Sequence, residues 1–257
     1  MKFCKLQRTI ADFADPAWQP YWTNYKDLKK IIKDLPHNNV SPCSSPIDIR
    51  LRMEKCPGER AFFKVLHSEF RKATIFFGKT FQELVEKQTE VQKGLEDLKA
   101  TPSSSSPSRV DYKTYSTVAK NIYLLHRDEL LLELYAIMSY ISFSKILKKH
   151  DKNTGYETSA AFMTNMVNKA NFTHYPELTN MIQKSEDMFD TFLEQIPEDG
   201  HKMLGDDERL FISMIHRFYK QILDETGKHV QPDAVSLLRR RSEHGESEHS
   251  RTSMDES

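Results

Sequence analysis

Residues 59–98 carry a long helical pattern and read ERAFFKVLHSEFRKATIFFGKTFQELVEKQTEVQKGLEDL. Most intervals between the apolar residues of this stretch are three or four, along Phe62, Leu66, Phe70, Ala73, Phe77, Phe81, Leu84, Val91, Leu95 and Leu98. This spacing places the apolar side chains on one face of an amphipathic α-helix. At 1.5 Å per residue, the predicted helix is roughly 60 Å long.

A second long helix is predicted from about residue 110 to residue 150. The run ATPSSSSPSR (100–109) between the two stretches is typical of a flexible connector. Two long helices joined by a short linker are expected to pack as an antiparallel pair. The second helix is expected to end at KNTG (152–155), where Gly155 suits the left-handed cap position.

Shorter helices are predicted on both sides of this pair. Upstream, residues 15–35 begin with a helix-start signal and end before a proline, and the pattern is clearly helical from Tyr25 onward. Downstream, residues 175–193 and 206–227 each carry one apolar stripe at helical spacing. The chain from residue 230 onward is polar, lacks periodicity and is expected to be disordered. With no convincing strand pattern, the predicted fold class is all-α.

Composition excludes several kinds of function. The 257 residues contain 37 basic and 37 acidic side chains, so any binding site for a polyanion must be local. Three cysteines fit neither a disulfide framework nor a metal-ligand spacing, and a reducing compartment is expected. The N-terminus lacks the apolar core of a signal peptide. The most apolar stretch, residues 130–143, contains Glu133 and is too short to span a bilayer.

Sequence motifs for common enzyme chemistry are missing. The chain contains no GxxxxGKS/T, GxGxxG or HExxH motif, and its ten histidines are scattered. Nothing in the sequence brings a nucleophile next to a base. The chain is therefore expected not to be an enzyme, with an enzyme of unrecognised site as the open alternative.

Two rows of lysines are the main signal for function. The first row is Lys26, Lys29, Lys30 and Lys33, with Tyr25 one turn before Lys29, and the second is Lys145, Lys148, Lys149 and Lys152. Each row has i, i+3, i+4, i+7 spacing, which places it on one helix face. Like charges at this spacing destabilise a helix by a few tenths of a kcal/mol per pair, so two such rows indicate an anion that neutralises them. The alternative is an ordinary solvated face, and periodicity leaves open whether the rows meet.

Four blocks of the sequence, in order, resemble the SPX domain family. They are MKF with Lys5, followed by Trp18 and YKDLKK (25–30); ERAFFKVLHSEFRKATIFF (59–77); KILKKHDKNTG (145–155); and NFTHYPELTNMIQKSEDMF (171–189). Cys4 departs from the family pattern, in which a small residue is usual at this place. The resemblance implies a short N-terminal helical hairpin packed on two long antiparallel helices, with short C-terminal helices.

The resemblance also implies a division of the chain. Residues 1–195 would form the SPX-like inositol polyphosphate-binding domain. Residues 196–228 would add an amphipathic helix that either packs back on the bundle or docks a partner, and residues 229–257 would be a disordered polar tail. No transporter, polymerase, phosphodiesterase or RING region follows in this sequence, so the expected output is a protein partner.

The function implied by the resemblance is a sensor of phosphate status that binds inositol polyphosphates, best as pyrophosphates, and uses no cofactor. The residues that match the family's binding positions are Tyr25, Lys29 and Lys148, surrounded by Lys145, Lys149, Lys152, Lys26 and Lys30, with Lys2 and Lys5 facing the same patch. The partner would be a Myb-type transcription factor or a component of phosphate transport or polyphosphate metabolism, in the cytoplasm or nucleus. No direct contact with nucleic acid is expected. The alternative is a helical module that binds anionic membranes or nucleic acid.

Overall fold

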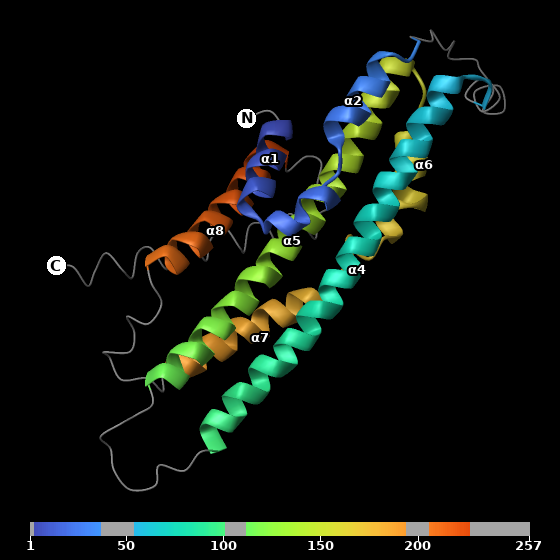
Figure 1. The fold of residues 1–257 in the computed structure, drawn as a ribbon. Coiled ribbons are helices and arrows are strands. Elements are labelled where there is room, and N and C mark those ends of the chain that lie inside the picture. Colours follow the sequence, from blue (N-terminus) through green and yellow to red (C-terminus); the bar gives the residue numbers. More distant parts are fainter. Residues whose placement is uncertain (1–2, 37–53, 101–111, 194–205, 227–257) are drawn as a thin grey trace, which may run out of the picture. The chain divides into compact units, whose positions relative to one another are not determined.

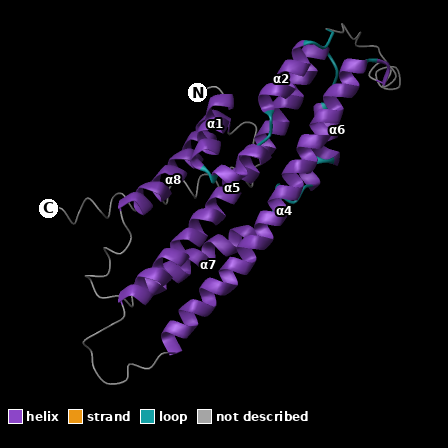
Figure 2. Cartoon of the chain, in the orientation of Figure 1, coloured by secondary structure: helices purple, strands orange, loops and turns teal. Residues whose placement is uncertain are grey.

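Helices make up all the regular structure in the part of the chain that the computed structural model describes, which is residues 3–36, 54–100, 112–193 and 206–226. In chain order they are α1 (Phe3–Phe13), the 3₁₀ helix η1 (Pro16–Tyr21), α2 (Tyr25–Lys33), α4 (Pro57–Ala100), α5 (Tyr112–Thr154), α6 (Ser159–Asn165), the 3₁₀ helix η2 (Val167–Lys169), α7 (Pro176–Leu193) and α8 (Asp206–Thr226) (Figure 1). Figure 2 shows purple helices and no strand within these ranges. The all-α fold class is confirmed.

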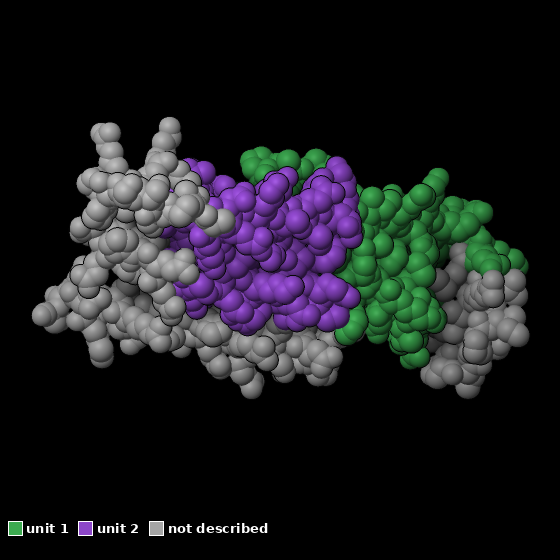
Figure 3. Space-filling model, turned by 90° about the horizontal axis from the view of Figure 1, so that it is seen from below, with its two compact units in different colours: residues 1–78, 135–174, 225–235 green, residues 79–134, 175–224, 236–257 purple. Residues whose placement is uncertain are grey.

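Two compact units make up the chain (Figure 3). Unit 1 comprises residues 1–78, 135–174 and 225–235, and unit 2 comprises residues 79–134, 175–224 and 236–257. The boundaries fall inside α4 and α5, so each long helix contributes to both units.

The N-terminal region is divided more finely than the sequence pattern predicted. Instead of one helical segment over residues 15–35, the chain forms η1 and then α2. Pro20 lies inside η1, where its missing N–H removes a donor that an α-helix would need. Asn24 then caps α2, because its side chain accepts a hydrogen bond from the Asp27 backbone N–H at 3.3 Å. With α1 ahead of η1, the two short N-terminal helices implied by the resemblance are present.

In unit 1, the first part of α4 packs against the last part of α5. The Phe62 ring stacks on the His150 ring with centroids 4.5 Å apart. Fourteen residues further along α4, Phe76 lies 4.7 Å from Tyr135, which is earlier in α5. Because the residue number rises along one helix while it falls along the other, the two segments are antiparallel, as predicted.

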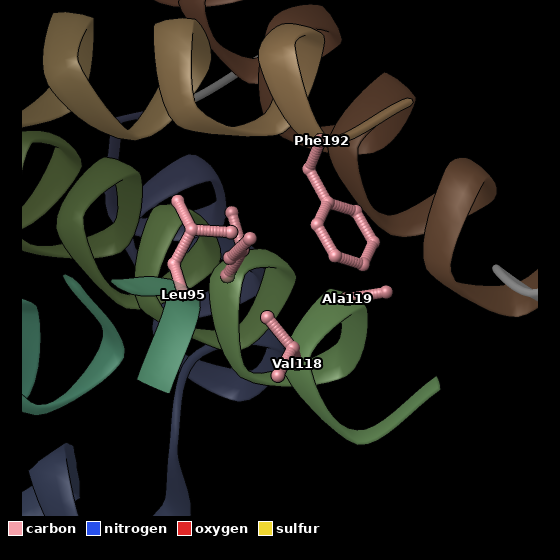
Figure 4. Close-up of a cluster of buried hydrophobic side chains, with 5 residues drawn as sticks. Leu95, Val118, Ala119 and Phe192 are labelled. Carbon is pink, nitrogen blue, oxygen red and sulfur yellow. The ribbon is translucent and has the colours of Figure 1, made fainter. Parts of the chain in front are cut away.

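Unit 2 repeats this antiparallel arrangement with the remaining halves of the long helices. The Lys87 Nζ of α4 is 2.8 Å from an oxygen of Asp128 in α5. Further along α4, the buried cluster of Leu95, Val118, Ala119, Ile122 and Phe192 joins α4, α5 and α7 (Figure 4). Phe192 of α7 points toward Ala119 in this view, so the predicted apolar stripe of residues 175–193 does enter a core.

Helix α8 also packs in unit 2. The fully buried Tyr219 donates a hydrogen bond to Glu133 Oε2 at 2.5 Å and contacts the Leu130 carbonyl oxygen at 3.2 Å. The Arg127 guanidinium lies 5.7 Å from the centre of the Phe211 ring. The amphipathic pattern over residues 206–227 therefore marks a helix whose apolar face lies against α5.

The end of α5 confirms one detail of the sequence analysis. The helix runs to Thr154, inside the predicted stop at KNTG (152–155), and Gly155 follows with φ 78°. This left-handed conformation favours glycine, because a Cβ would be strained there. The predicted connector (100–109, apart from Ala100) and polar tail (229–257) lie outside the described residues.

By length and composition alone, α5 would pass as a membrane-spanning helix over Tyr115–Thr154, with mean hydropathy 1.5 in its most apolar window. However, 89% of that window is buried inside the structure. The apolar residues therefore have protein neighbours, as in the core helix of a bundle.

Candidate functional site

An aromatic pair in unit 1 brings one lysine from each predicted row to the same place. The Phe3 ring of α1 meets the Tyr25 ring of α2 edge to face, with centroids 4.9 Å apart. The Lys29 Nζ lies 5.8 Å from the Tyr25 centroid, and the Lys145 Nζ of α5 lies 5.7 Å from the Phe3 centroid. Cation–π attraction holds both ammonium groups near the rings. Helices α1, α2 and α5 therefore all contribute to this part of the surface.

A hydrogen bond joins α2 and α5 a second time. The Asn153 Nδ2 near the end of α5 donates to the Ile32 carbonyl oxygen near the end of α2 at 2.8 Å. The start of α2 is linked to Lys145 through Phe3, so the two segments lie side by side and point in the same direction (Figure 1). Because both helices rise equally per residue, Lys29 comes level with residues 149 and 150, within one turn of Lys148. The two lysine rows thus run alongside each other.

The described side chains of the predicted site differ in exposure. Lys29 and Lys145 are half-buried and Tyr25 is buried, whereas Lys5, Lys26, Lys30, Lys148, Lys149 and Lys152 are exposed. We call these nine residues the basic surface. Lys2 lies outside the described residues. Spacing alone allowed Lys29 to lie on a solvated helix face, but the structure shows it half-buried. Its Nζ lies over the Tyr25 ring, 5.8 Å from the centroid, and 3.4 Å from Cys4 Sγ.

The charge of Lys30 in the basic surface is partly offset by an acidic neighbour. Lys30 pairs with Asp27 at 2.7 Å, at i, i+3 on α2, and both side chains are at least half exposed. Such exposed pairs contribute roughly 0 to 1 kcal/mol, so a polyanion competes with Asp27 at little cost. Lys30 therefore remains suited to an anion, although Asp27 offsets part of its charge.

The Tyr25 hydroxyl is suited to donate a hydrogen bond. Burial, with a smaller contribution from the Cys4 thiol, raises the pKa of Tyr25 to about 12. The hydroxyl therefore keeps its proton at neutral pH and can act as a donor. The sequence predicted this residue type and its place beside Lys29, and the structure adds that the ring is packed among α1 and α2.

Beside the basic surface lies a buried polar network that the sequence analysis missed. His150 Nε2 is 2.8 Å from Glu59 Oε2 of α4, and its Nδ1 is 3.2 Å from Asp151 Oδ1. His150 and Glu59 have 0% and 1% exposed side chains. Asp151 also accepts hydrogen bonds from Thr158, through both N and Oγ1, and from the Ser159 N. Only the register of the two long helices pairs Glu59 with His150, and no local pattern encodes it.

The charges in this network support one another. Burial lowers the pKa of His150, but the hydrogen bonds and charges of Asp151 and Glu59 outweigh it and leave that pKa raised. Burial likewise raises the pKa of Asp151, but hydrogen bonds from His150, Ser159 and Thr158 lower it to about 2. A protonated imidazole can donate to both carboxylates at once.

No metal site accompanies this arrangement within the described part of the chain. Nowhere in those ranges do three or more His, Cys, Asp or Glu side chains come together in a way that could hold a metal ion. The surface consists of ammonium groups and one phenol, and these groups donate hydrogen bonds to oxyanions. Its chemistry is that of anion binding.

Several known proteins are similar to this chain in amino-acid sequence. The family model of the SPX domain matches residues 101–166. SPX domain-containing protein 4 of Oryza sativa subsp. japonica is 28% identical over 192 residues, which cover 72% of this chain and 60% of that protein. SPX domain-containing protein 6 of the same rice is 27% identical over 188 residues, covering 73% of this chain and 69% of that protein. The chain thus spans about 60% of the first of these relatives.

A solved structure shows the same fold. The SPX domain of Chaetomium thermophilum glycerophosphodiester phosphodiesterase 1, in complex with inositol hexakisphosphate, matches with a TM-score of 0.54 and 19% sequence identity. The match covers 75% of this chain and 99% of that domain. The family model and the rice relatives confirm the resemblance found in the sequence, and the solved structure shows the same fold: this chain is similar to the SPX domain family.

Proposed function

We propose that this chain binds an inositol polyphosphate on the basic surface, most tightly in the pyrophosphate form. The observation that carries the proposal is the meeting of the two lysine rows, through Lys145, Phe3 and Tyr25 at one end and through Asn153 and Ile32 at the other. A compact polyanion needs several positive groups within its own width. The fungal SPX domain with bound inositol hexakisphosphate supports this choice of ligand.

The residue types fit this ligand. Each lysine offers a point charge and three donors without requiring the fixed geometry of a guanidinium group. The protonated Tyr25 hydroxyl adds one oriented donor to the flexible ammonium groups. A shallow surface of this kind can accept phosphates at different ring positions, and a pyrophosphate adds charge within the same area.

We infer that binding serves as a signal of phosphate status and not as a catalytic step. The ligand-binding region would be residues 1–195, and the output would be a protein partner, either a Myb-type transcription factor or a component of phosphate transport or polyphosphate metabolism. This inference rests on the resemblance to SPX domain-containing proteins. The sites of action would be the cytoplasm, the nucleus or both.

Titration calorimetry with three ligands tests the proposal. We expect an inositol pyrophosphate and inositol hexakisphosphate to bind far more tightly than inorganic phosphate, which is too small to contact several lysines. Each charge-assisted contact contributes about 1.5 to 3 kcal/mol before solvent screening, so two lost contacts weaken binding more than roughly a hundredfold. Comparable affinity for inorganic phosphate and inositol hexakisphosphate would contradict the proposal.

Two further ligands separate this function from a general attraction to anions. Single-stranded DNA and vesicles containing phosphatidylserine would bind a nonspecific basic surface, with an affinity that falls steeply as salt is added. Such binding would not depend on the Tyr25 hydroxyl. If Tyr25→Phe weakens only inositol hexakisphosphate binding, the site is specific; if DNA or vesicles bind as tightly as that ligand, the alternative module is correct.

A further inference from the structure

The buried network of His150, Glu59 and Asp151 lies directly behind the second lysine row, since His150 follows Lys149 in α5. We propose that these three residues are positioning residues for inositol polyphosphate binding, which hold the end of α5 so that its lysines face the ligand. The inference rests on the proposed function. It adds that affinity depends on the protonation of a histidine that does not touch the ligand.

The network ties the end of α5 to two other elements. On the side of α4, Glu59 bonds to the imidazole, and Phe62 stacks on it at 4.5 Å with the planes 8° apart. On the side of α6, Asp151 accepts two hydrogen bonds from Thr158 and one from Ser159 at 2.6 to 3.0 Å. These contacts anchor the last turn of α5, which as a helix terminus would otherwise be prone to fray.

This anchor determines which way the lysines point. Successive residues of an α-helix are about 100° apart, so burying one side chain sets the direction of its neighbours. His150 is fully buried, while Lys148, Lys149 and Lys152 on the same two turns are exposed. A rotation or loosening of this turn would move the lysines and also the Asn153 contact to α2. The network thereby controls how the two lysine rows are aligned.

The protonation of His150 decides how strongly the network holds. Two carboxylates contact its ring, Glu59 from α4 and Asp151 from its own helix. The exposed Lys149 precedes it in α5, and the Tyr156 ring lies 6.3 Å away. The Thr158 hydroxyl lies 3.2 Å from its Nδ1. Protonated, His150 neutralises one of its two carboxylate neighbours, the buried Glu59 and the partly buried Asp151. Neutral, the imidazole has one N–H and can donate to only one of the two carboxylates, which costs free energy because Glu59 is buried. The hydrogen bonds and charges of Asp151 and Glu59 raise the pKa of His150 more than burial lowers it. His150 therefore stays protonated to a higher pH than a free histidine does.

The test measures inositol hexakisphosphate binding by calorimetry from pH 6 to pH 9 for the wild-type chain, Glu59→Gln and His150→Gln. We expect both substitutions to weaken binding on the order of three- to thirtyfold at the lower pH values. Glu59→Gln should also shift the midpoint of the pH profile downward, because it removes a carboxylate that favours protonation of His150. Glu83→Gln makes the same chemical change on an exposed side chain later in α4 and should leave affinity and profile unchanged.

A measurement on the wild-type chain keeps the inference testable if a variant does not fold. If protonated His150 favours the ligand-binding arrangement, then inositol hexakisphosphate must in turn favour protonation of His150. NMR titration of the imidazole should therefore give a higher midpoint at saturating ligand than without it. An unchanged midpoint, or wild-type affinity and pH profile in both folded variants, would overturn the inference.

Lys148→Ala distinguishes this failure from failure of the proposed function. If the wild-type chain binds inositol hexakisphosphate and Lys148→Ala weakens it, the ligand site stands whatever the His150 network does. If the wild-type chain does not bind that ligand, the proposed function is wrong, and the positioning role is wrong with it.

Discussion

Replacing Lys29 by methionine tests the site at its half-buried lysine. The change removes the charge and keeps a side chain of similar length. In the wild-type chain, the Lys29 Nζ lies 5.8 Å from the Tyr25 centroid and 3.4 Å from the Cys4 Sγ. Lys29→Met therefore removes a cation–π contact, a weak bond to a thiol and, if the proposed function is right, one contact to the ligand.

The structural cost of this substitution should be small. A partly exposed cation–π contact contributes about 0.5 to 1 kcal/mol. Relief of repulsion from Lys26 and Lys33, at i−3 and i+4, offsets this by a few tenths of a kcal/mol. The free energy of unfolding should thus fall by less than about 1 kcal/mol. The lost ligand contact should cost about 1.5 to 3 kcal/mol, which raises the dissociation constant roughly 10- to 150-fold.

Calorimetry with inositol hexakisphosphate and urea unfolding separate the two effects. Lys120→Met is the matched control, because Lys120 is exposed on α5 and lies about 38 Å before Lys145 along the same helix. That distance exceeds the screening length of about 8 Å at physiological salt, so the control should bind as the wild type does. An unchanged dissociation constant for Lys29→Met would refute its place in the site. Equal weakening in both variants would indicate nonspecific attraction.

Two further predictions concern stability. Phe77 is only 3% exposed, so Phe77→Ala should lower the free energy of unfolding by roughly 3 to 5 kcal/mol, and a loss below about 1 kcal/mol in thermal melting would show that the ring is not part of the core. Asp151 has a pKa of about 2 in the folded state, against about 3.9 in an unfolded chain. Its ionised form therefore adds on the order of 2 kcal/mol to the free energy of unfolding above pH 4, and this contribution is lost as the pH falls toward 2. Urea unfolding at pH 6 and pH 2.5 should therefore show a smaller gap between wild type and Asp151→Asn at the lower pH; an equal gap would mean that the carboxylate charge is not involved.

The sequence-based predictions were most accurate where the apolar pattern of a helix was longest. Over α4, the apolar spacing persisted for forty residues, and the helix was found within two residues of the predicted ends. Over residues 15–35 the same reasoning merged η1 and α2, because a few residues around Pro20 cannot distinguish an α-helix from a 3₁₀ helix. The seven-residue helix α6 was not predicted, since so short a segment shows barely two turns of periodicity.

By itself the sequence determined the helical fold class, the two long amphipathic helices and the arrangement of each lysine row along one helix face. These are properties of single helices, because residues spaced at the helical period of 3.6 lie on the same face. Only the tertiary structure decided that α2 lies beside the end of α5, that Lys29 is half-buried against Tyr25, and that His150 sits between two carboxylates. Glu59 and His150 are 91 residues apart, and the packing of two long helices along their shared length sets the register that joins them. No local pattern contains that register, because it depends on how both apolar faces fit together.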